Sequence, residues 1–156
     1  MAIRNMVTDD DPILHKKCRE VTSFDEHLSV LIDDMIETLH SFDKAVGLAA
    51  PQIGILRRVV VIDVGEGVIE LVNPEIVAQK GKQFGPEGCL SYPNVYGNVE
   101  RPNYVKVKAY DRKGEPFFLE GTELLARAFC HEIDHLNGIV FLDKAKELKE
   151  IECAGV

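Results

Sequence analysis

Two histidines four residues apart, with a glutamate beside the first, place the strongest constraint on this chain of 156 residues. The motif reads His131-Glu132-Ile133-Asp134-His135. On a helix, residues at i and i+4 lie on one face, so both imidazoles can hold one metal ion. The glutamate can then act as general base toward a water molecule on that metal. Because the pattern is short, a His–Glu–His stripe on a solvated helix surface is the alternative.

The residues around the motif independently predict the helix that it requires. Residues 124–129 are good helix formers, and Gly138 is a natural helix end. The sequence therefore predicts a helix over residues 122–137. Asp134 lies off the ligand face of this helix, so we expect it either to bond a neighbouring group or to be a solvated charge.

A hydrolytic metal site needs a third protein ligand and one open position. Phe141 stands where the metzincin pattern has its third histidine, and this excludes a metzincin. Asp143 and Glu147 are carboxylate candidates downstream, but Gly138 is expected to end the helix before them. The upstream candidate is Cys89, whose alternative is a small buried apolar residue.

The chain contains four cysteines, and no two of them form a C-x-x-C pair. Cys130 is adjacent to His131 and points about 100° away from it on a helix, so Cys89 is the preferred third ligand. Cys18 and Cys153 lie in weakly structured ends, and we expect no role for them. The start of the chain lacks the apolar run of a secretory signal, and no stretch reaches membrane-spanning length. A reducing compartment without disulfides is therefore expected.

The order of predicted elements indicates an α+β fold in one domain, residues 1–156. We expect mixed or antiparallel sheets packed around a central helix that carries the H-E-x-x-H metal site, because βαβ alternation is absent. The predicted elements are an irregular arm over residues 1–24, a helix from Asp25 to about Phe42, a small-residue loop over 47–54, strands over 57–64, 68–79, 99–111 and 117–119, and a short helix or frayed tail over 147–154.

The charge balance argues against a nucleic-acid-binding protein. The 26 acidic residues exceed the 18 basic residues, which gives a net charge of -8. Tight binding to phosphate backbones requires clustered lysines and arginines. We therefore expect no specific nucleic acid partner and no membrane partner.

Three segments of the chain resemble the peptide deformylase family, in which G-x-G-L-A-A-P-Q, E-G-C-L-S and Q-H-E-x-D-H occur in this order. Here residues 45–52 read A-V-G-L-A-A-P-Q, residues 87–91 read E-G-C-L-S and residues 130–135 read C-H-E-I-D-H. Each segment alone is modest, but three in order are specific. Ala45 and Cys130 depart from the pattern, and neither position is a metal ligand or the general base in the family.

The resemblance implies one divalent metal ion held by Cys89, His131 and His135. Fe²⁺ is the native metal that it implies, and Zn²⁺, Ni²⁺ or Co²⁺ are accepted. The implied reaction removes the N-formyl group from the initiator methionine of nascent polypeptides and releases formate. Glu132 is then the general base, while the Gln52 side chain and the Leu90 backbone N–H stabilise the oxyanion.

The resemblance also implies a set of substrate contacts. The peptide backbone pairs like an added strand near Val46 and Gly47, and Glu87 and Gly88 belong to the same binding surface. Helix spacing places further residues on the metal side, where they would line a pocket for methionine: Leu124, Arg127 and Ala128. Arg127 is either part of that wall or a solvated helix charge.

The expected partners are N-formylmethionyl nascent peptides, with transient ribosome contact, in a bacterial cytoplasm. Ribosome docking by the C-terminal tail is doubtful, because its lysines are offset by glutamates. Two alternatives remain. A small zinc peptidase would use the same H-E-x-x-H unit, and a structural zinc site in a binding module would need Cys130 as a fourth ligand.

Overall fold

The computed structural model describes residues 2–8 and 10–150, and side chains as far as residue 145. Within these residues it contains two α-helices, three short 3-10 helices and eight strands. In chain order they are η1 (Pro12–His15), α1 (Glu26–His40), β1 (Gly47–Ala49), η2 (Ala50–Ile53), β2 (Val59–Asp63), β3 (Val68–Lys80), β4 (Gln83–Cys89), β5 (Tyr92–Arg101), β6 (Tyr104–Tyr110), β7 (Pro116–Thr122), α2 (Glu123–Leu136), η3 (Phe141–Asp143) and β8 (Lys146–Glu150).

The larger sheet has five strands in the order β1-β2-β3-β6-β7, and every pairing in it is antiparallel. Strand β2 is buried on both faces. Val59 and Val61 pack into the core beneath α1, whereas Val60 and Ile62 pack into the core beneath α2. This double burial explains why β2 is a continuous apolar run rather than an alternating one.

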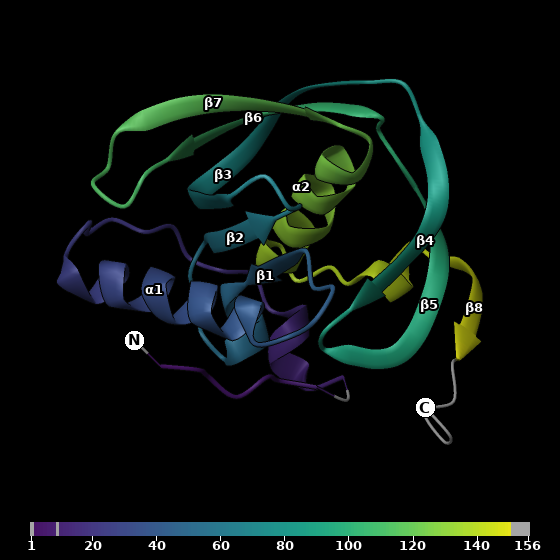
Figure 1. Ribbon diagram of the computed structural model, residues 1–156, viewed down its shortest axis with the longest axis horizontal. Coiled ribbons are helices and arrows are strands. Elements are labelled where there is room, and N and C mark those ends of the chain that lie inside the picture. Colours follow the sequence, from purple (N-terminus) through teal and green to yellow (C-terminus); the bar gives the residue numbers. More distant parts are fainter. Residues whose placement is uncertain (1, 9, 151–156) are drawn as a thin grey trace.

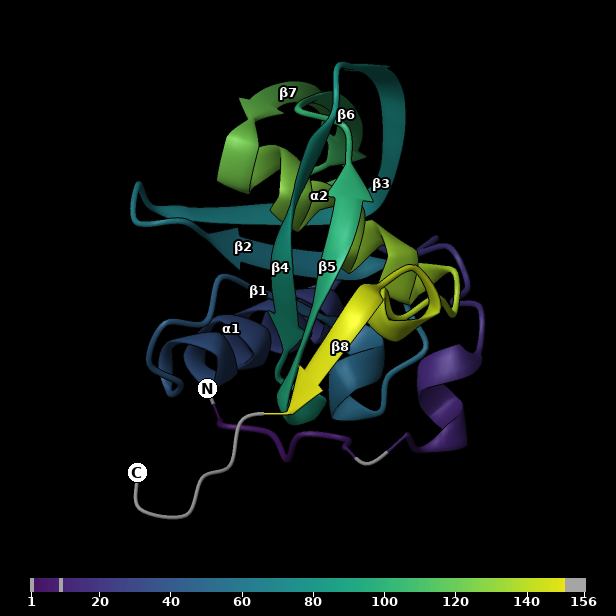
Figure 2. The same cartoon turned by 90° about the vertical axis from the view of Figure 1, so that its right-hand side faces the viewer.

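The smaller sheet has three antiparallel strands in the order β4-β5-β8. Strands β4 and β5 form a hairpin that closes next to the Cys89–Tyr92 pair. In Figure 1 this hairpin extends along one side of the molecule, and Figure 2 shows it in front of α2. The hairpin therefore brings residues near position 89 to the helix that carries the two histidines.

Helix α2 lies between the two sheets, where it contacts β1, β2, β6 and β7 of the larger sheet and β5 of the smaller one (Figures 1 and 2). Ten of its residues are buried, including both histidines of the motif. Helix α1 packs on the opposite face of the larger sheet, and the Asp25 carboxylate caps it by accepting a hydrogen bond from the Leu28 N–H at 3.1 Å.

The α+β class is confirmed, and the sheets are antiparallel rather than mixed. The predicted helices over 25–42 and 122–137 correspond to α1 and α2. The predicted loop over 47–54 is wrong, because it contains β1 and η2. The predicted strand over 99–111 is also wrong, because it is divided between β5 and β6.

The C-terminal segment also differs from expectation. Residues 146–150 form β8, which pairs with β5, rather than a helix or a frayed tail. Residues 151–154 of that predicted element, and Cys153 with them, lie outside the described residues. In the part of the chain that the structure describes, no helix has the length and apolar character needed to cross a membrane.

Candidate active site

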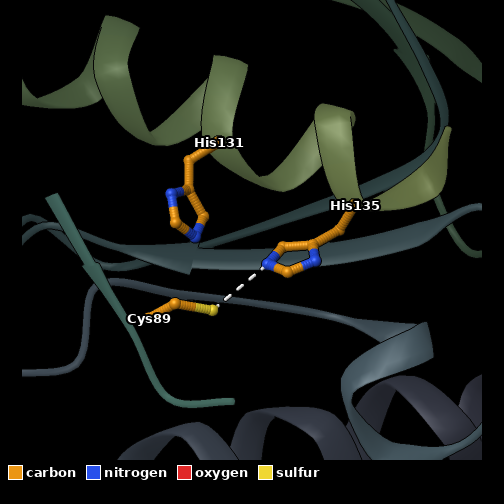
Figure 3. Close-up of side chains that lie close together, drawn as sticks. All are labelled: Cys89, His131 and His135. Atoms are coloured by element: carbon orange, nitrogen blue, oxygen red, sulfur yellow. Dashed lines mark hydrogen bonds between the residues drawn. The ribbon is translucent and has the colours of Figure 1, made fainter. Parts of the chain in front are cut away.

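Cys89, His131 and His135 come together as one cluster of potential metal ligands. One donor atom from each residue lies within 4.8 Å of the others. Figure 3 shows the two imidazoles projecting from α2 toward the thiol at the end of β4. The Cys89 Sγ is 3.3 Å from Nε2 of His135. Helix periodicity aligns the two histidines on one face of α2. The sulfur comes from Cys89, the last residue of β4 in the smaller sheet.

A buried carboxylate fixes the orientation of the first histidine. The carboxylate of Glu87 lies 2.7 Å from Nδ1 of His131. It also accepts two hydrogen bonds from Arg101, at 2.8 and 2.9 Å, and one from Arg127. A hydrogen bond at Nδ1 leaves Nε2 of His131 for the site, as in most metal-binding histidines.

Charge pairing keeps Glu87 ionised despite its burial. Burial raises the pKa of this carboxyl group, but the hydrogen bonds from Arg101 and His131 outweigh it and hold the pKa well below its usual range. Arg101 also donates to Asp134 at 2.7 Å, and Asp134 pairs with Lys144 at 3.0 Å. Asp134 therefore bonds to neighbouring groups and is not a solvated charge. This was one of the two alternatives expected from the sequence. Removing one partner of a buried ion pair typically costs about 3–5 kcal/mol.

Glu132 is 4% exposed and lies against β1. Burial raises the pKa of its carboxyl group to about 7, while the neighbouring His131 acts in the opposite direction. Its Oε1 atom is fully enclosed and has no hydrogen-bond partner among the described residues. A carboxyl group poised near neutral pH suits proton transfer in both directions.

Gly47 provides the space that Glu132 occupies. A Cβ atom on Gly47 would lie 2.6 Å from Oε2 of Glu132 and 2.9 Å from its Cδ. These separations are shorter than van der Waals contact, so any side chain at position 47 must displace the carboxylate. The glycine at this point of β1 is therefore required for close packing rather than for an unusual φ angle.

We expect Gly47→Ala to lower kcat by at least about tenfold, because a misplaced general base loses much of its contribution. Metal content should be unchanged, since Gly47 is not among the three candidate ligands. Gly85→Ala is the matched control, because a Cβ there would lie at an ordinary 3.6 Å from the Arg127 guanidinium. A Gly47→Ala enzyme with the kcat of the Gly85→Ala enzyme would contradict this interpretation.

Gln52 directs an amide donor at the site. Its Oε1 accepts a hydrogen bond from the Ala49 N–H at 3.0 Å, which fixes the orientation of the amide. Its Nε2 therefore points to Sγ of Cys89, at 3.4 Å, and to Oγ of Ser91, at 3.3 Å. Leu90 follows Cys89 in the hairpin turn, so its backbone N–H comes from the same segment as the sulfur.

A cavity of about 480 Å³ lies beside the cluster, between the segment before β1 and the β4–β5 hairpin. It is lined by every residue that the sequence suggested for substrate contact: Val46, Gly47, Glu87, Gly88, Leu124, Arg127 and Ala128. Sequence reasoning missed further lining residues, among them Phe42, Tyr92 and Tyr96. Aromatic side chains outside a motif carry no signal of such a role in one sequence.

The structure bears on two expectations about individual residues. The carboxylate of Glu87 is engaged by two arginines and His131, so it supports a histidine rather than offering a free group to substrate. Arg127 is not a solvated charge, because it is 8% exposed and also donates to the Val99 carbonyl at 3.2 Å. Arg101 was not foreseen, since a lone arginine at a strand end gives no sequence signal.

The donor set fits a divalent metal ion. A thiol and two imidazoles suit iron and zinc alike. Burial lowers the pKa of both histidines, and that of His135 falls well below its usual range, whereas the charges and hydrogen bonds of Glu132, Cys89 and Glu87 outweigh burial at His131 and raise its pKa. Cys130 is not part of the cluster within the described residues, and burial raises the pKa of its thiol to about 11. Among the described residues, the three ligands therefore have no fourth protein donor such as a closed structural site requires.

The chain is similar to known proteins along nearly its whole length. The family model described as "Polypeptide deformylase" matches residues 3–150. A protein named peptide deformylase from Alkaliphilus metalliredigens is 61% identical over 144 residues, which are 92% of this chain and 97% of that protein. One from Caldanaerobacter subterraneus is 54% identical and covers all of this chain and 98% of its own length. The crystal structure of peptide deformylase from Thermotoga maritima superposes with a TM-score of 0.90 at 40% identity, over 94% of this chain and 100% of that one.

Proposed function

The chain belongs to the polypeptide deformylase family, and from this premise we propose how its residues remove the formyl group from the N-terminus of nascent peptides. Membership of this family identifies the reaction, which is hydrolysis of a formamide bond with release of formate. We assign the reaction to particular residues because Cys89, His131 and His135 come together beside a buried Glu132 and a cavity.

Peptide deformylases depend on a metal, and we propose that Cys89, His131 and His135 hold it here. The fit rests on the thiol and imidazole donors and on the enclosed Oε1 of Glu132, which has no partner among the described residues. When bound, a divalent ion would make water a stronger nucleophile and polarise the formyl carbonyl. From the family resemblance we propose Fe²⁺ as the native ion, with Zn²⁺, Ni²⁺ or Co²⁺ as substitutes, because thiolate and imidazole donors do not by themselves select iron over zinc.

Glu132 moves the proton. It takes the proton from the attacking water at its carboxylate oxygen and then delivers it to the amine that leaves. A pKa of about 7 serves both steps, since the group can accept and release a proton at neutral pH. The carboxylate of Glu132 lies over Gly47, so it faces the cavity edge where a peptide backbone would run.

Gln52 and Leu90 stabilise the charge that develops on the formyl oxygen. The Gln52 amide is fixed by Ala49 and aimed at the cluster before substrate arrives. Such preorganised donors need no reorganisation during the reaction, and losing one typically costs about 3 kcal/mol of transition-state stabilisation. The Leu90 backbone N–H would be the second donor, from the turn that positions Cys89.

Substrate binding uses the cavity between the two sheets. Val46 precedes the edge strand β1 and Gly47 begins it, so an extended peptide can pair with this segment through backbone hydrogen bonds. Main-chain pairing tolerates varied sequences, which suits an enzyme that meets many nascent chains. Leu124 and Ala128 form an apolar wall for the methionine side chain, with the Arg127 stem beside them.

The remaining proposals concern the setting of the reaction. Named relatives from bacteria support a bacterial cytoplasm, where formylated nascent chains are made. We propose that ribosome contact is transient. Residues 146–150 pair with β5 as strand β8, so this part of the C-terminal segment does not form a projecting basic helix.

Formate release from formyl-Met-Ala-Ser under anaerobic conditions, together with metal analysis, tests this function. We expect one metal ion per chain and turnover that chelators abolish and Fe²⁺ restores. Unformylated Met-Ala-Ser serves as the control substrate, because a small zinc peptidase would cleave it. Peptide-bond cleavage without formate release would refute the assignment.

A further inference from the structure

Phe141 packs against the ring of one candidate metal ligand. The Phe141 side chain is 1% exposed, and its ring lies 6.0 Å from that of His131 with an angle of 24° between the planes. Offset stacking of this kind is a favourable aromatic geometry. The residue that takes the place of a third histidine in the sequence pattern thus lies against the site without being able to ligate.

A second aromatic residue holds Phe141 in place. The Tyr92 ring meets the Phe141 ring edge-on, at 6.1 Å and 79°. The Tyr92 hydroxyl is itself anchored, because it donates to the carboxylate of Asp10 at 2.6 Å. Phe141 and Tyr92 belong to one buried cluster, and Cys89 packs against that cluster. The cluster therefore touches two of the three candidate ligands.

The conformation of the backbone after α2 places Phe141 against the ring of His131. Gly138 follows the helix with a φ of 75°, and a Cβ there would lie 2.6 Å from the His15 carbonyl oxygen. Only glycine combines this left-handed conformation with so close an approach. The chain then enters η3 at Phe141, where the Val140 N–H donates to the Asp143 carboxylate at 3.1 Å.

The two contacts to His131 restrain different motions of its ring. The hydrogen bond between Nδ1 and Glu87 restrains the edge of the ring. A flat, buried partner against the ring face restrains tilting of the ring out of its plane. With both contacts, Nε2 keeps one direction toward the space it shares with Cys89 and His135.

We propose that Phe141 is a positioning residue that holds the His131 ring for metal binding and slows loss of the metal. The inference rests on the proposed role of His131 as a ligand. A stacking contact of this kind is worth about 0.5–1.5 kcal/mol, which corresponds to a change of about 2- to 13-fold in a rate.

The test measures how fast zinc leaves the holoenzyme. Zinc-loaded Phe141→Leu and Phe129→Leu enzymes are mixed with excess chelator, and the dissociation rates are compared with that of the unchanged enzyme. Phe129 is the matched control, because it is equally buried, at 0%, but belongs to the separate core between α2 and the larger sheet. We expect about 2- to 13-fold faster release from Phe141→Leu, and less than twofold change from Phe129→Leu.

Cobalt-loaded enzyme gives a second readout that a general loss of stability would not move. We expect the visible absorption bands to change in Phe141→Leu and to stay unchanged in Phe129→Leu. Equal rates of zinc release from both variants overturn the inference about Phe141 but do not affect the proposed metal site. Failure of the unchanged enzyme to bind zinc refutes the proposed function instead. If Phe141→Leu does not fold, Phe141→Tyr keeps the ring and must retain the slow rate, and faster release from it overturns the inference.

Discussion

Replacing Glu132 with alanine should reduce kcat by about 100- to 10,000-fold, the range that a general acid–base group contributes. The carboxylate is the proton carrier in the proposed reaction, and the neighbouring carboxylate of Glu87 cannot replace it, because Glu87 is engaged by Arg101, Arg127 and His131. Metal content should stay near one per chain, since Glu132 is not among the three clustered ligands. Formate release and metal analysis on the same preparation measure both quantities.

Glu132→Gln is the control for packing around this side chain. The amide keeps the size of the group that lies over Gly47 but cannot carry the proton. We expect it to be as inactive as the alanine variant while unfolding at a similar temperature to the unchanged enzyme. Substantial turnover by either metal-loaded variant would remove Glu132 from the mechanism.

Replacing Cys89 with alanine should weaken metal binding by more than about 100-fold, and activity should be lost with the metal. Loss of an outer hydrogen-bond partner of a ligand already costs about 10- to 100-fold in metal affinity, and Cys89 is proposed as a ligand itself. Equilibrium dialysis against Zn²⁺ at fixed pH measures this change.

Cys130→Ala is the matched control for the loss of a thiol. Cys130 is buried at 5%, and burial raises the pKa of its thiol to about 11, so it remains a protonated core residue. We expect this variant to bind one metal ion per chain with unchanged affinity. A Cys130→Ala protein that loses the metal while Cys89→Ala retains it would reverse the assignment and favour a different site.

The sequence predicted the parts of the site that depend on local periodicity. Spacing alone placed His131 and His135 on one face of a helix, and α2 has that helix within one residue of each expected end. The strand over residues 57–64 was predicted from its continuous apolar run at residues 59–62, and the helix after Asp25 from its periodicity; they correspond to β2 and α1. In these segments the positions of apolar residues within the element itself indicate which side chains are buried.

The parts that sequence reasoning missed depend on contacts between distant residues. Strand β4 contains two glycines and a proline, which argue against a strand, yet its pairing with β5 overrides that local preference. Arg101 and Glu87 are 14 residues apart, and their side chains meet because β4 and β5 fold back on each other. The stack of Phe141 on His131 likewise depends on a chain reversal at Gly138, whose consequence a linear pattern cannot show.

The candidate ligands lie on a strand of the smaller sheet and on helix α2, and this placement has a mechanical consequence. Cys89 and His135 are 46 residues apart, one on the hairpin of the smaller sheet and the other on the helix that packs on the larger sheet. An ion held by both would act as a cross-link that closes a long loop, and such links restrict the unfolded chain most when the loop is long. The same bond that supplies the chemistry would thus fasten the two halves of the molecule to each other.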